Sequence, residues 1–268
     1  MEAQRITSRQ NPRVKDAARL RTGRERQRQG RFLIDGAREI RRAIASGMRC
    51  IEAFVCESLC EASDARSAVA ELTAAGAEIL VVSPEVYSKL AFGGRDEGLV
   101  VVAETPRRRL NELTLPNTPL IAVLEGVEKP GNVGAILRSA DAAGVDAIIV
   151  ADGRTDLFNP NTIRASLGTV FRENVFRATS VETLNWLREK NLPIVTARPD
   201  AETLYTSIDF RHGAAIVLGS EASGLSQAWR GENVKPVRLP MHGQADSLNV
   251  SATAGVLFYE ALRQRTPT

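Results

Sequence analysis

Three segments of the chain carry polar residues whose types and spacing could do chemistry. Asn132 stands at the start of an expected helix over residues 130–144, where free backbone amides and the positive end of the helix dipole can receive an anion. Glu221 follows the carboxyl end of an apolar strand, where ligands of α/β sheets tend to bind. Residues 239–251 form a polar loop before a long apolar helix, for which Ser247 is the expected N-cap. Such a loop can hold a polar ligand edge-on.

Arg138 lies in the same expected helix as Asn132. The apolar residues of this helix fall on one stripe, and at ~100° per residue Arg138 points about 140° away from it. Periodicity leaves two interpretations open, an ordinary exposed arginine or a cation that faces a ligand. No G-x-G-x-x-G follows a strand anywhere in the chain, so the usual dinucleotide-binding fold lacks support.

Composition excludes several classes of protein. A chain of 268 residues with 43% hydrophobic residues can form about two domains, each with its own core. No apolar run approaches the ~18 residues of a membrane span, and the first residues lack the apolar core of a signal peptide. We therefore expect a cytoplasmic protein. Cys50, Cys56 and Cys60 have no ligand pair elsewhere, so we expect reduced, mostly buried thiols and no metal site.

Basic residues are concentrated near the N-terminus. Residues 1–42 contain thirteen Lys or Arg and five Asp or Glu, whereas the remaining residues contain 22 basic and 27 acidic side chains. A basic helix is expected over residues 12–29, and its charges are spread around it, which leaves no large apolar face. Such a segment is either a solvated helix or, as we expect, an arm that binds nucleic-acid phosphate. The candidate RNA contacts are Arg9, Arg13, Lys15, Arg31 and Arg38.

Short apolar strands, among them those expected at residues 31–35, 78–82 and 194–197, alternate with helices along most of the chain, which predicts an α/β fold. The alternation stops at residues 104–118, where prolines and a charge cluster predict a linker. We therefore expect a small, basic, RNA-binding α/β domain over residues 1–103 and a second domain over residues 119–268. The strands of the second domain are nearly continuous apolar runs, which predicts a parallel sheet covered by helices on both faces.

The polar segments contain three motifs in a fixed order. They are Asn132-x5-Arg138 with Ala140 and Gly144, then Gly219-Ser-Glu221-Ala-Ser-Gly224, then Pro240-Met-x-Gly243 with Ser247-Leu-Asn249-Val-Ser251 and Glu260. Over about residues 119–264 this set resembles the SpoU (TrmH-type) RNA 2′-O-methyltransferases. The N-terminal half, with Ile6-Thr-Ser-Arg-Gln-Asn-Pro-Arg-Val-Lys15 and Phe32-Leu-Ile-Asp-Gly-Ala-Arg38, is similar to the family's small substrate-binding domain, which is itself similar to certain ribosomal proteins.

The resemblance implies a C-terminal domain threaded into a deep trefoil knot, one of the rare exceptions to unknotted topology. It implies S-adenosylmethionine bound in the knot, an obligate homodimer, and transfer of a methyl group to a ribose 2′-hydroxyl. It also implies ribosomal RNA as the substrate, because ribosomal members of the family usually carry the N-terminal domain, whereas the simplest tRNA enzymes lack it.

The resemblance further assigns roles to residues of this chain. Gly219, Leu239 and Leu248 are expected to contact the cofactor, with Thr196 and Met241 nearby. Asn132, Arg138, Glu221, Ser247 and Asn249 are expected around the transferred methyl group and the ribose. Arg138 is at the position usually assigned as the base, yet arginine is effectively always protonated. It would either accept a proton transiently in a dry site or, as we favour, orient a phosphate and stabilise a developing alkoxide.

Three other functions remain open at this point. The chain could methylate tRNA, it could be a non-catalytic RNA-binding protein that keeps the knot fold, or it could act on a free nucleotide. A non-catalytic protein would have no reason to keep the polar set of the three motifs, which consists of Asn132, Arg138, Glu221, Ser247 and Asn249. A basic N-terminal domain would have no purpose in an enzyme for free nucleotides.

Overall fold

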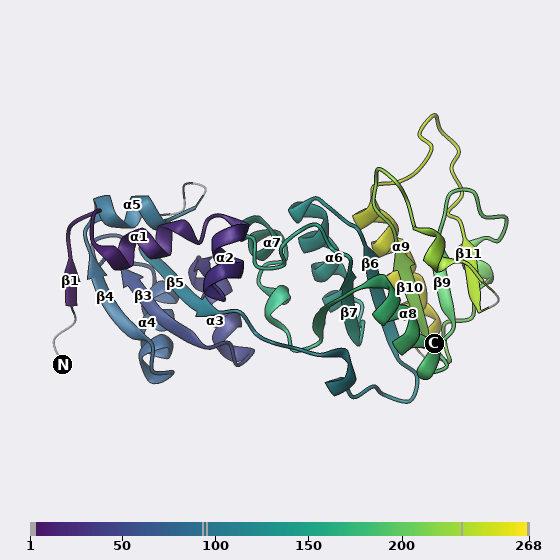
Figure 1. The fold of residues 1–268 in the computed structure, drawn as a ribbon, viewed down its shortest axis with the longest axis horizontal. Helices are drawn as coiled ribbons and strands as arrows, with labels where there is room; N and C mark the ends of the chain where they lie inside the picture. The colour runs from purple at the N-terminus through teal and green to yellow at the C-terminus, as the bar shows by residue number, and fades with distance from the viewer. Residues whose placement is uncertain (1–3, 93, 95, 232, 267–268) are drawn as a thin grey trace. The chain divides into compact units, whose positions relative to one another are not determined.

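The computed structural model describes residues 4–92, 94, 96–231 and 233–266. The chain forms two compact units (Figure 1). The first unit comprises Met1–Arg107 and Asp156–Arg172, and the second comprises Arg108–Thr155 and Glu173–Thr268. The chain thus enters the second unit within the expected linker at residues 104–118, but residues 156–172 return to the first unit. No pattern in the sequence indicates this return.

The first unit is built on a mixed five-stranded sheet in the order β1-β4-β3-β5-β2, in which β5 is antiparallel to both β2 and β3. Its elements are β1 (Gln4–Ile6), α1 (Pro12–Arg19), α2 (Gly23–Gln29), β2 (Arg31–Asp35), α3 (Ala37–Ala45), β3 (Cys50–Val55), α4 (Ser63–Ala74), β4 (Glu78–Val82), α5 (Pro84–Leu90), β5 (Leu99–Glu104), α7 (Pro160–Ala165) and the 3-10 helix η2 (Thr169–Phe171). The strands expected at residues 31–35 and 78–82 have the predicted bounds.

The second unit is built on a parallel six-stranded sheet in the order β11-β9-β10-β6-β7-β8. Its elements are η1 (Leu110–Glu112), β6 (Leu120–Glu125), α6 (Pro130–Ala142), β7 (Ala147–Ala151), β8 (Val175–Ala178), α8 (Ser180–Glu189), β9 (Ile194–Ala197), η3 (Tyr205–Ser207), β10 (Ala214–Leu218), η4 (Gln227–Trp229), β11 (Val234–Val237) and α9 (Val250–Arg265). Figure 1 shows α8 on one side of this sheet and α9 on the other, which confirms the predicted α/β architecture.

The basic N-terminal segment differs from the single helix without an apolar face that we expected. It forms two helices, α1 and α2, and Val14, Ala17 and Leu20 are buried in the core of the first unit. These residues recur every third position, so they form a stripe on one side of α1. The prediction is wrong because a few well-spaced apolar side chains are enough to pack α1 against α5.

Arg26 is a buried member of the basic segment. Its side chain is 4% exposed, and its Nε donates to Asp156 Oδ2 at 2.5 Å. Its Nη1 donates to the backbone oxygens of Leu20 and Arg21 at 2.8 and 3.0 Å. A buried guanidinium needs such partners, because an unpaired buried charge is strongly destabilising. Arg26 therefore holds α2 against the returning residues 156–172 and is not available to a ligand.

Residues 156–172 pack in the first unit mainly through aromatic rings. The ring centroid of Phe32 lies 4.3 Å from that of Phe158 and 6.0 Å from that of Phe171. Arg42 Nη1 donates to the backbone oxygen of Leu167 at 2.6 Å. The aromatic stack and the Arg26 ion pair together explain why this segment belongs to the first unit.

No helix within the described residues is long and apolar enough to cross a membrane.

Candidate active site

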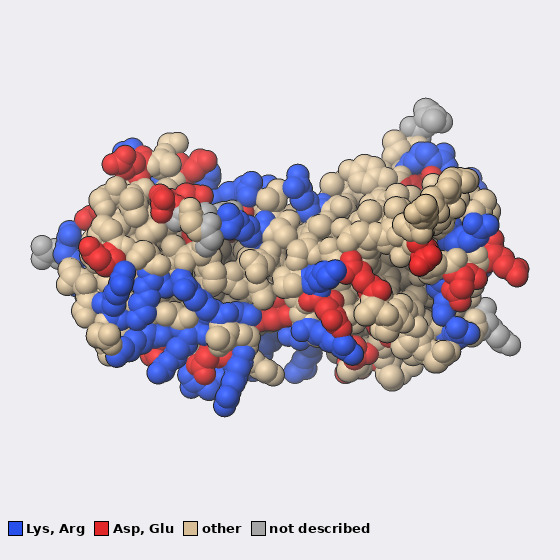
Figure 2. Space-filling model, turned by 90° about the horizontal axis from the view of Figure 1, so that it is seen from above, with Lys and Arg blue, Asp and Glu red and all other residues tan. Residues whose placement is uncertain are grey.

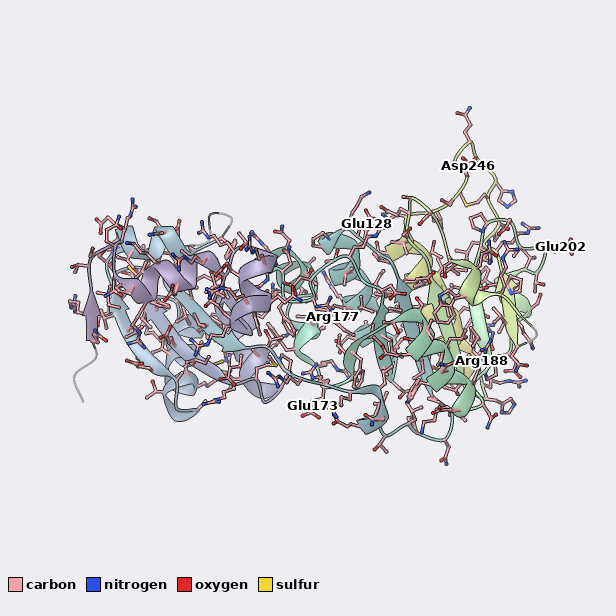
Figure 3. All side chains as sticks on the ribbon, viewed as in Figure 1. Glu128, Glu173, Arg177, Arg188, Glu202 and Asp246 are labelled. Atoms are coloured by element: carbon pink, nitrogen blue, oxygen red, sulfur yellow. The ribbon has the colours of Figure 1, made fainter. Side chains whose placement is uncertain are left out.

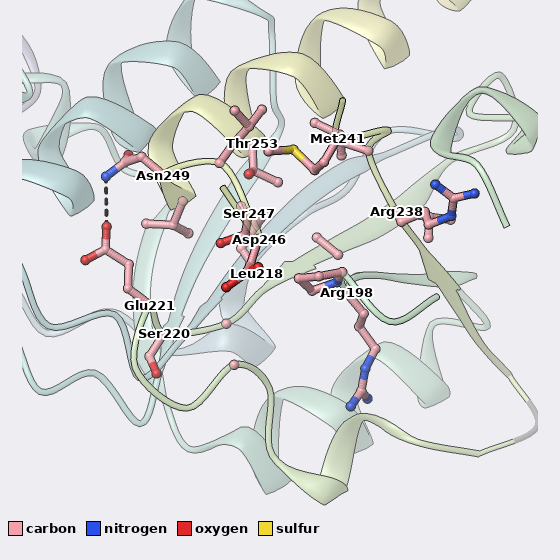
Figure 4. A pocket seen from close by; sticks show the side chains of 18 of the residues that line it. Arg198, Leu218, Ser220, Glu221, Arg238, Met241, Asp246, Ser247, Asn249 and Thr253 are labelled. Atoms are coloured by element: carbon pink, nitrogen blue, oxygen red, sulfur yellow. Dashed lines mark hydrogen bonds between the residues drawn. The ribbon is translucent and has the colours of Figure 1, made fainter. Parts of the chain in front are cut away.

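Three loops of the second unit meet around one cavity of about 610 Å³ (Figure 4). They follow β9, β10 and β11, and the last of them leads into α9. Because these strands are parallel neighbours, their carboxyl ends lie at one edge of the sheet, the usual position of a ligand site in an α/β fold. Figure 3 shows Asp246, which also lines the cavity, on the long loop that projects between β11 and α9.

The loop after β10 is closed tightly on itself. Ser220 N donates to Gly224 O at 3.2 Å, and Gly224 N donates to Ser220 O at 3.0 Å. A Cβ added at Gly219 would lie 2.4 Å from the carbonyl carbon of Gly224, so only glycine fits there without moving the loop. The hydroxyl oxygens of Ser220 and Ser223 are 2.8 Å apart. This compact turn presents Glu221 beside the cavity.

Glu221 is the centre of a hydrogen-bonded cluster that joins all three motifs. Asn132 Nδ2 and Asn249 Nδ2 donate to Glu221 Oε1 at 2.7 and 2.8 Å, and Lys129 Nζ lies 2.6 Å from Glu221 Oε2. The hydrogen bond from Lys129 lowers the pKa of the Glu221 carboxyl, and that from Asn132 adds to the effect. The carboxylate is therefore ionised at neutral pH and suits the orientation of amide groups better than the donation of a proton.

Asn249 is also the N-cap of α9, a role that the sequence analysis gives to Ser247. Asn249 Oδ1 accepts from Ser251 N at 2.9 Å and from Ser251 Oγ at 2.6 Å, while its Nδ2 faces Glu221 (Figure 4). The prediction for Ser247 is wrong because the helix begins later, at Val250. Ser247 instead lines the cavity.

Four of the five predicted cofactor contacts line the cavity, namely Gly219, Leu239, Met241 and Leu248. With Leu218 and Val237 they provide apolar surface, while Arg198, Asp246 and Ser247 add polar residues to the lining. Ligand pockets of this size combine apolar walls with a few polar groups that fix the ligand's orientation. The residues present therefore fit S-adenosylmethionine, which has a flat heteroaromatic base and polar hydroxyl and amino acid groups.

The fifth predicted cofactor contact, Thr196, does not line this cavity. It is fully buried on β9 and lines a second, smaller cavity. Side chains alternate along a strand, so Thr196 and the cavity-lining Ala197 point to opposite faces of the sheet.

Arg138 does not join the Glu221 cluster in the described chain. It lies on α6, six residues beyond Asn132, which corresponds to about 9 Å along the helix axis and about 120° around it. Its side chain is exposed and does not line the cavity. Within the described residues Arg138 has no hydrogen-bond or ion-pair partner. A guanidinium placed this way is accessible to a ligand that approaches from solvent.

Two residues that shape the site were not predicted from the sequence. Lys129 lines the cavity and pairs with Glu221, and its only sequence signal is its position just before a helix-starting proline. Glu125, which ends β6, is 6% exposed and accepts from Ser226 N, Ser226 Oγ and Ser180 Oγ at 2.7, 2.6 and 2.8 Å. Glu125 therefore fixes the far end of the loop that carries Glu221. A lone acid at the end of an apolar strand could have indicated it.

Three of the five predicted RNA contacts are tied to neighbouring groups in the first unit. Arg13 bridges Glu52 and Glu78, and these carboxylates, Glu78 above all, raise its pKa. Arg38 pairs with the buried carboxylate of the adjacent residue at 2.7 Å. Arg9 donates to a backbone oxygen and a serine hydroxyl at 2.8 and 3.1 Å.

The other two, Lys15 and Arg31, are exposed and have no ion-pair or hydrogen-bond partner among the described residues. Figure 2 shows Lys and Arg side chains gathered along one side of the first unit, at the lower left of this view, whereas the second unit shows mixed charge. Lys15 and Arg31 are therefore the predicted contacts that are most available to a phosphate.

The three cysteines are free and buried, as predicted. Burial raises the pKa of Cys50 to about 11, so its thiol is protonated at neutral pH. Across the part of the chain that the structure describes, no group of three or more His, Cys, Asp or Glu side chains could hold a metal ion.

An RNA-modifying transferase needs a cofactor cavity, polar groups beside it and a surface that binds RNA. This chain has a cavity at the carboxyl edge of a parallel sheet, a carboxylate–amide cluster beside that cavity, and a basic unit. The SpoU rRNA Methylase family matches residues 119–259, and the MRM3-like substrate binding domain matches residues 11–100. The chain belongs to the SpoU rRNA methylase family.

Relatives cover nearly the whole chain. It is 32% identical over 272 residues to the 23S rRNA (uridine(2479)-2′-O)-methyltransferase of Streptomyces viridochromogenes, an alignment that covers 98% of this chain and 93% of that protein. A solved RNA 2′-O ribose methyltransferase is 45% identical, with a TM-score of 0.84 over 98% of this chain and 99% of the other. The SpoU methyltransferase AviRb from Streptomyces viridochromogenes, solved with the cofactor AdoMet, is 28% identical, with a TM-score of 0.87 over 96% and 98%.

These similarities confirm the predicted family, the α/β fold class, the enzyme class and the cofactor. The chain is an S-adenosylmethionine-dependent RNA methyltransferase of the ribose-modifying kind. The trefoil knot, the homodimer and the roles of individual residues stay predictions.

Proposed function

We propose that this chain transfers the methyl group of S-adenosylmethionine to a ribose 2′-hydroxyl of 23S ribosomal RNA. The observation that carries the reaction is the cluster of Asn132, Glu221 and Asn249 at the cofactor cavity, which brings all three motifs together. The substrate follows from the Streptomyces relative, whose name gives 23S rRNA, and from the matched substrate-binding domain.

The bound cofactor supplies a methyl group on a positively charged sulfur. The sulfur becomes a neutral thioether when the methyl group is transferred, so this leaving group needs no acid. The main task of the protein is therefore to align the ribose hydroxyl with that methyl group. Glu221 holds the side-chain amides of Asn132 and Asn249 in fixed directions, so that they can bind the ribose. Ser247 would contribute a hydroxyl from the cavity wall.

Arg138 is proposed to hold a phosphate of the target nucleotide and to stabilise negative charge on the attacking oxygen, whose proton passes to solvent water as the methyl group is transferred. Its exposure favours this role over proton acceptance, because transient deprotonation of a guanidinium would require a dry site. Arg138→Lys keeps the charge but loses the planar fork, so near-normal turnover in that variant would contradict this assignment.

We also propose a knotted, cytoplasmic homodimer whose interface covers the exposed side of α9. Tyr259 on α9 is 52% exposed. A large aromatic side chain exposed on a helix favours a protein partner there. Sedimentation of the purified protein should give a dimer that Tyr259→Glu weakens, and a monomer at high concentration would contradict the proposal.

The methyl acceptor can be tested with purified protein and labelled S-adenosylmethionine. Incubation with ribosomal RNA should label a ribose oxygen, recovered as an alkali-resistant dinucleotide, and Glu221→Gln should abolish most of the label. Label on tRNA alone, or on a base, would contradict the proposed substrate or reaction.

A further inference from the structure

The charged side chains that line the cofactor cavity differ in whether the fold already pairs them. Among the described residues they are Lys129, Arg198, Glu221, Arg238 and Asp246. Lys129 pairs with Glu221 at 2.6 Å, and Arg198 Nε lies 3.4 Å from Asp200 Oδ1. Asp246 is exposed and has no hydrogen-bond or ion-pair partner in the part of the chain that the structure describes. Its negative charge is therefore the one in this lining that the described residues leave unpaired.

The position of Asp246 places this charge near the site of methyl transfer. Asp246 lies on the loop between β11 and α9, three residues before Asn249, and three residues span at most about 11 Å. Figure 4 shows Asp246 between Glu221 on one side of the cavity and Arg238 on the other, with the guanidinium of Arg238 turned away from it. An exposed carboxylate at this place is accessible to a molecule that fills the cavity.

The chemistry of the cofactor offers a partner for this carboxylate. S-adenosylmethionine carries positive charge on its sulfonium and on the α-ammonium of its amino acid part. A carboxylate accepts hydrogen bonds, and an ammonium donates three of them, whereas a sulfonium donates none. The hydroxyls of the cofactor's sugar can also donate, but they carry no charge. Covering an unpaired carboxylate with a neutral group costs free energy, and a charge-assisted hydrogen bond offsets that cost. The α-ammonium therefore fits Asp246 best.

We propose that Asp246 binds the α-ammonium group of S-adenosylmethionine and thereby selects ligands with an intact amino acid part. The inference deepens the proposed function and rests on it. The apolar walls of the cavity suit the heteroaromatic base but do not orient the flexible amino acid end. A carboxylate that fixes this end limits the positions that the neighbouring sulfur can take, and alignment of the methyl group depends on that sulfur.

The test is calorimetry on the full-length protein with three ligands. S-adenosylmethionine and S-adenosylhomocysteine both carry the α-ammonium, and only the first is a sulfonium. 5′-Methylthioadenosine keeps the base and the sugar but lacks the amino acid part. Asp246→Asn removes the charge with little change in shape, so it should weaken binding of the first two ligands by about 10-fold each and leave the third unchanged.

Glu202→Gln is the matched control for the loss of one negative charge. Glu202 lies on the loop after β9, is exposed, and does not line the cavity (Figure 3). This variant should bind all three ligands with the affinity of the wild type. Equal effects of Asp246→Asn and Glu202→Gln would show a general effect of net charge and would overturn the inference.

The pattern across the three ligands separates the possible contacts of Asp246. Weaker binding of S-adenosylmethionine alone would assign Asp246 to the sulfonium, and an equal loss for 5′-methylthioadenosine would assign it to the sugar. Either result, or no change for any ligand, would overturn the inference. If the wild type still binds S-adenosylmethionine and methylates ribosomal RNA in those cases, the proposed function stands without it. A wild type that binds no S-adenosylmethionine would contradict the proposed function itself.

Discussion

In the first unit Arg13 and Arg26 form ion pairs with Glu52 and Asp156, which belong to the packed structure of that unit. In the second unit Glu221 and Asn249 are exposed and form a hydrogen bond with each other beside the cofactor cavity. Arg13, Glu221 and Asn249 are predicted ligand contacts, and Arg26 lies in the basic segment that is predicted to bind phosphate. The difference is what surrounds them. Charge that folding has already neutralised contributes little to RNA affinity, while a preorganised exposed cluster can act on a ligand directly.

The largest effect is expected from Arg26→Leu. This change leaves the Asp156 carboxylate without its partner in a partly buried position, which typically destabilises a protein by about 3–5 kcal/mol. Chemical denaturation should show the loss. Arg28→Leu is the matched control, because its ion pair with Glu25 is exposed and such pairs contribute about 0.5 kcal/mol or less. Equal losses in the two variants would show that Arg26 is not a structural arginine.

Next in size is the effect of Asn249→Ala on methyl transfer. Removing a donor that is aligned in the active site typically lowers kcat by about 10²-fold. The same change also removes the N-cap of α9, which costs about 1 kcal/mol of stability. Asn249→Ser separates the two roles, since serine is a good N-cap but its shorter side chain cannot reach Glu221. Full activity in Asn249→Ser would remove the Glu221 contact from the account.

The pH dependence provides a smaller test of the same cluster. Lys129 holds the folded-state pKa of Glu221 below its ordinary value of about 4.3. The stability that the folded protein gains from the Lys129–Glu221 pair is therefore fully present above that ordinary pKa value. It is lost as the pH falls through the lowered pKa of Glu221. We expect kcat/KM to show no acidic limb from Glu221 between about pH 8 and 5. Lys129→Met should move the acidic limb upward, and identical profiles for the two proteins would contradict this role of Lys129.

The smallest effects should come from Lys15→Ala and Arg31→Ala. Both side chains are exposed and without partners among the described residues, so each change should weaken binding to any RNA a few-fold and lower the salt slope by about 1. Arg13→Ala should instead destabilise the first unit, because it leaves two glutamates unpaired. Salt titrations of RNA binding, set beside melting curves, would show whether the two groups of basic residues differ in this way.

The sequence predicts well whatever depends on local pattern. The apolar runs at residues 31–35 and 194–197 give strands with the expected bounds, because short runs of aromatic and β-branched residues favour extended backbone. The order of the three motifs indicates a common site, and the structure places Asn132, Glu221 and Asn249 within hydrogen-bonding distance. The resemblance to a known family gives that order its meaning. The spacing of the motifs along the chain does not predict the distances between their side chains in space.

The sequence predicts poorly whatever depends on partners far away in the chain. The basic residues at positions 13 and 26 look equally available until the structure shows the carboxylates that face them. Residues 156–172 carry no sign that Phe158 and Phe171 stack on Phe32. Ser247 and Asn249 are both good N-caps by type, and only the tertiary position of the loop selects Asn249.

The central claim is that three separated loops build one site that methylates a ribose of ribosomal RNA. The most direct measurement is a mass-spectrometric map of ribose methylation in 23S rRNA from cells that carry the wild-type chain, no chain, or Glu221→Gln. We expect one 2′-O-methylated nucleotide with the wild-type chain, its absence without the chain, and only trace methylation with Glu221→Gln. Identical maps in all three, or a full signal with Glu221→Gln, would contradict the account.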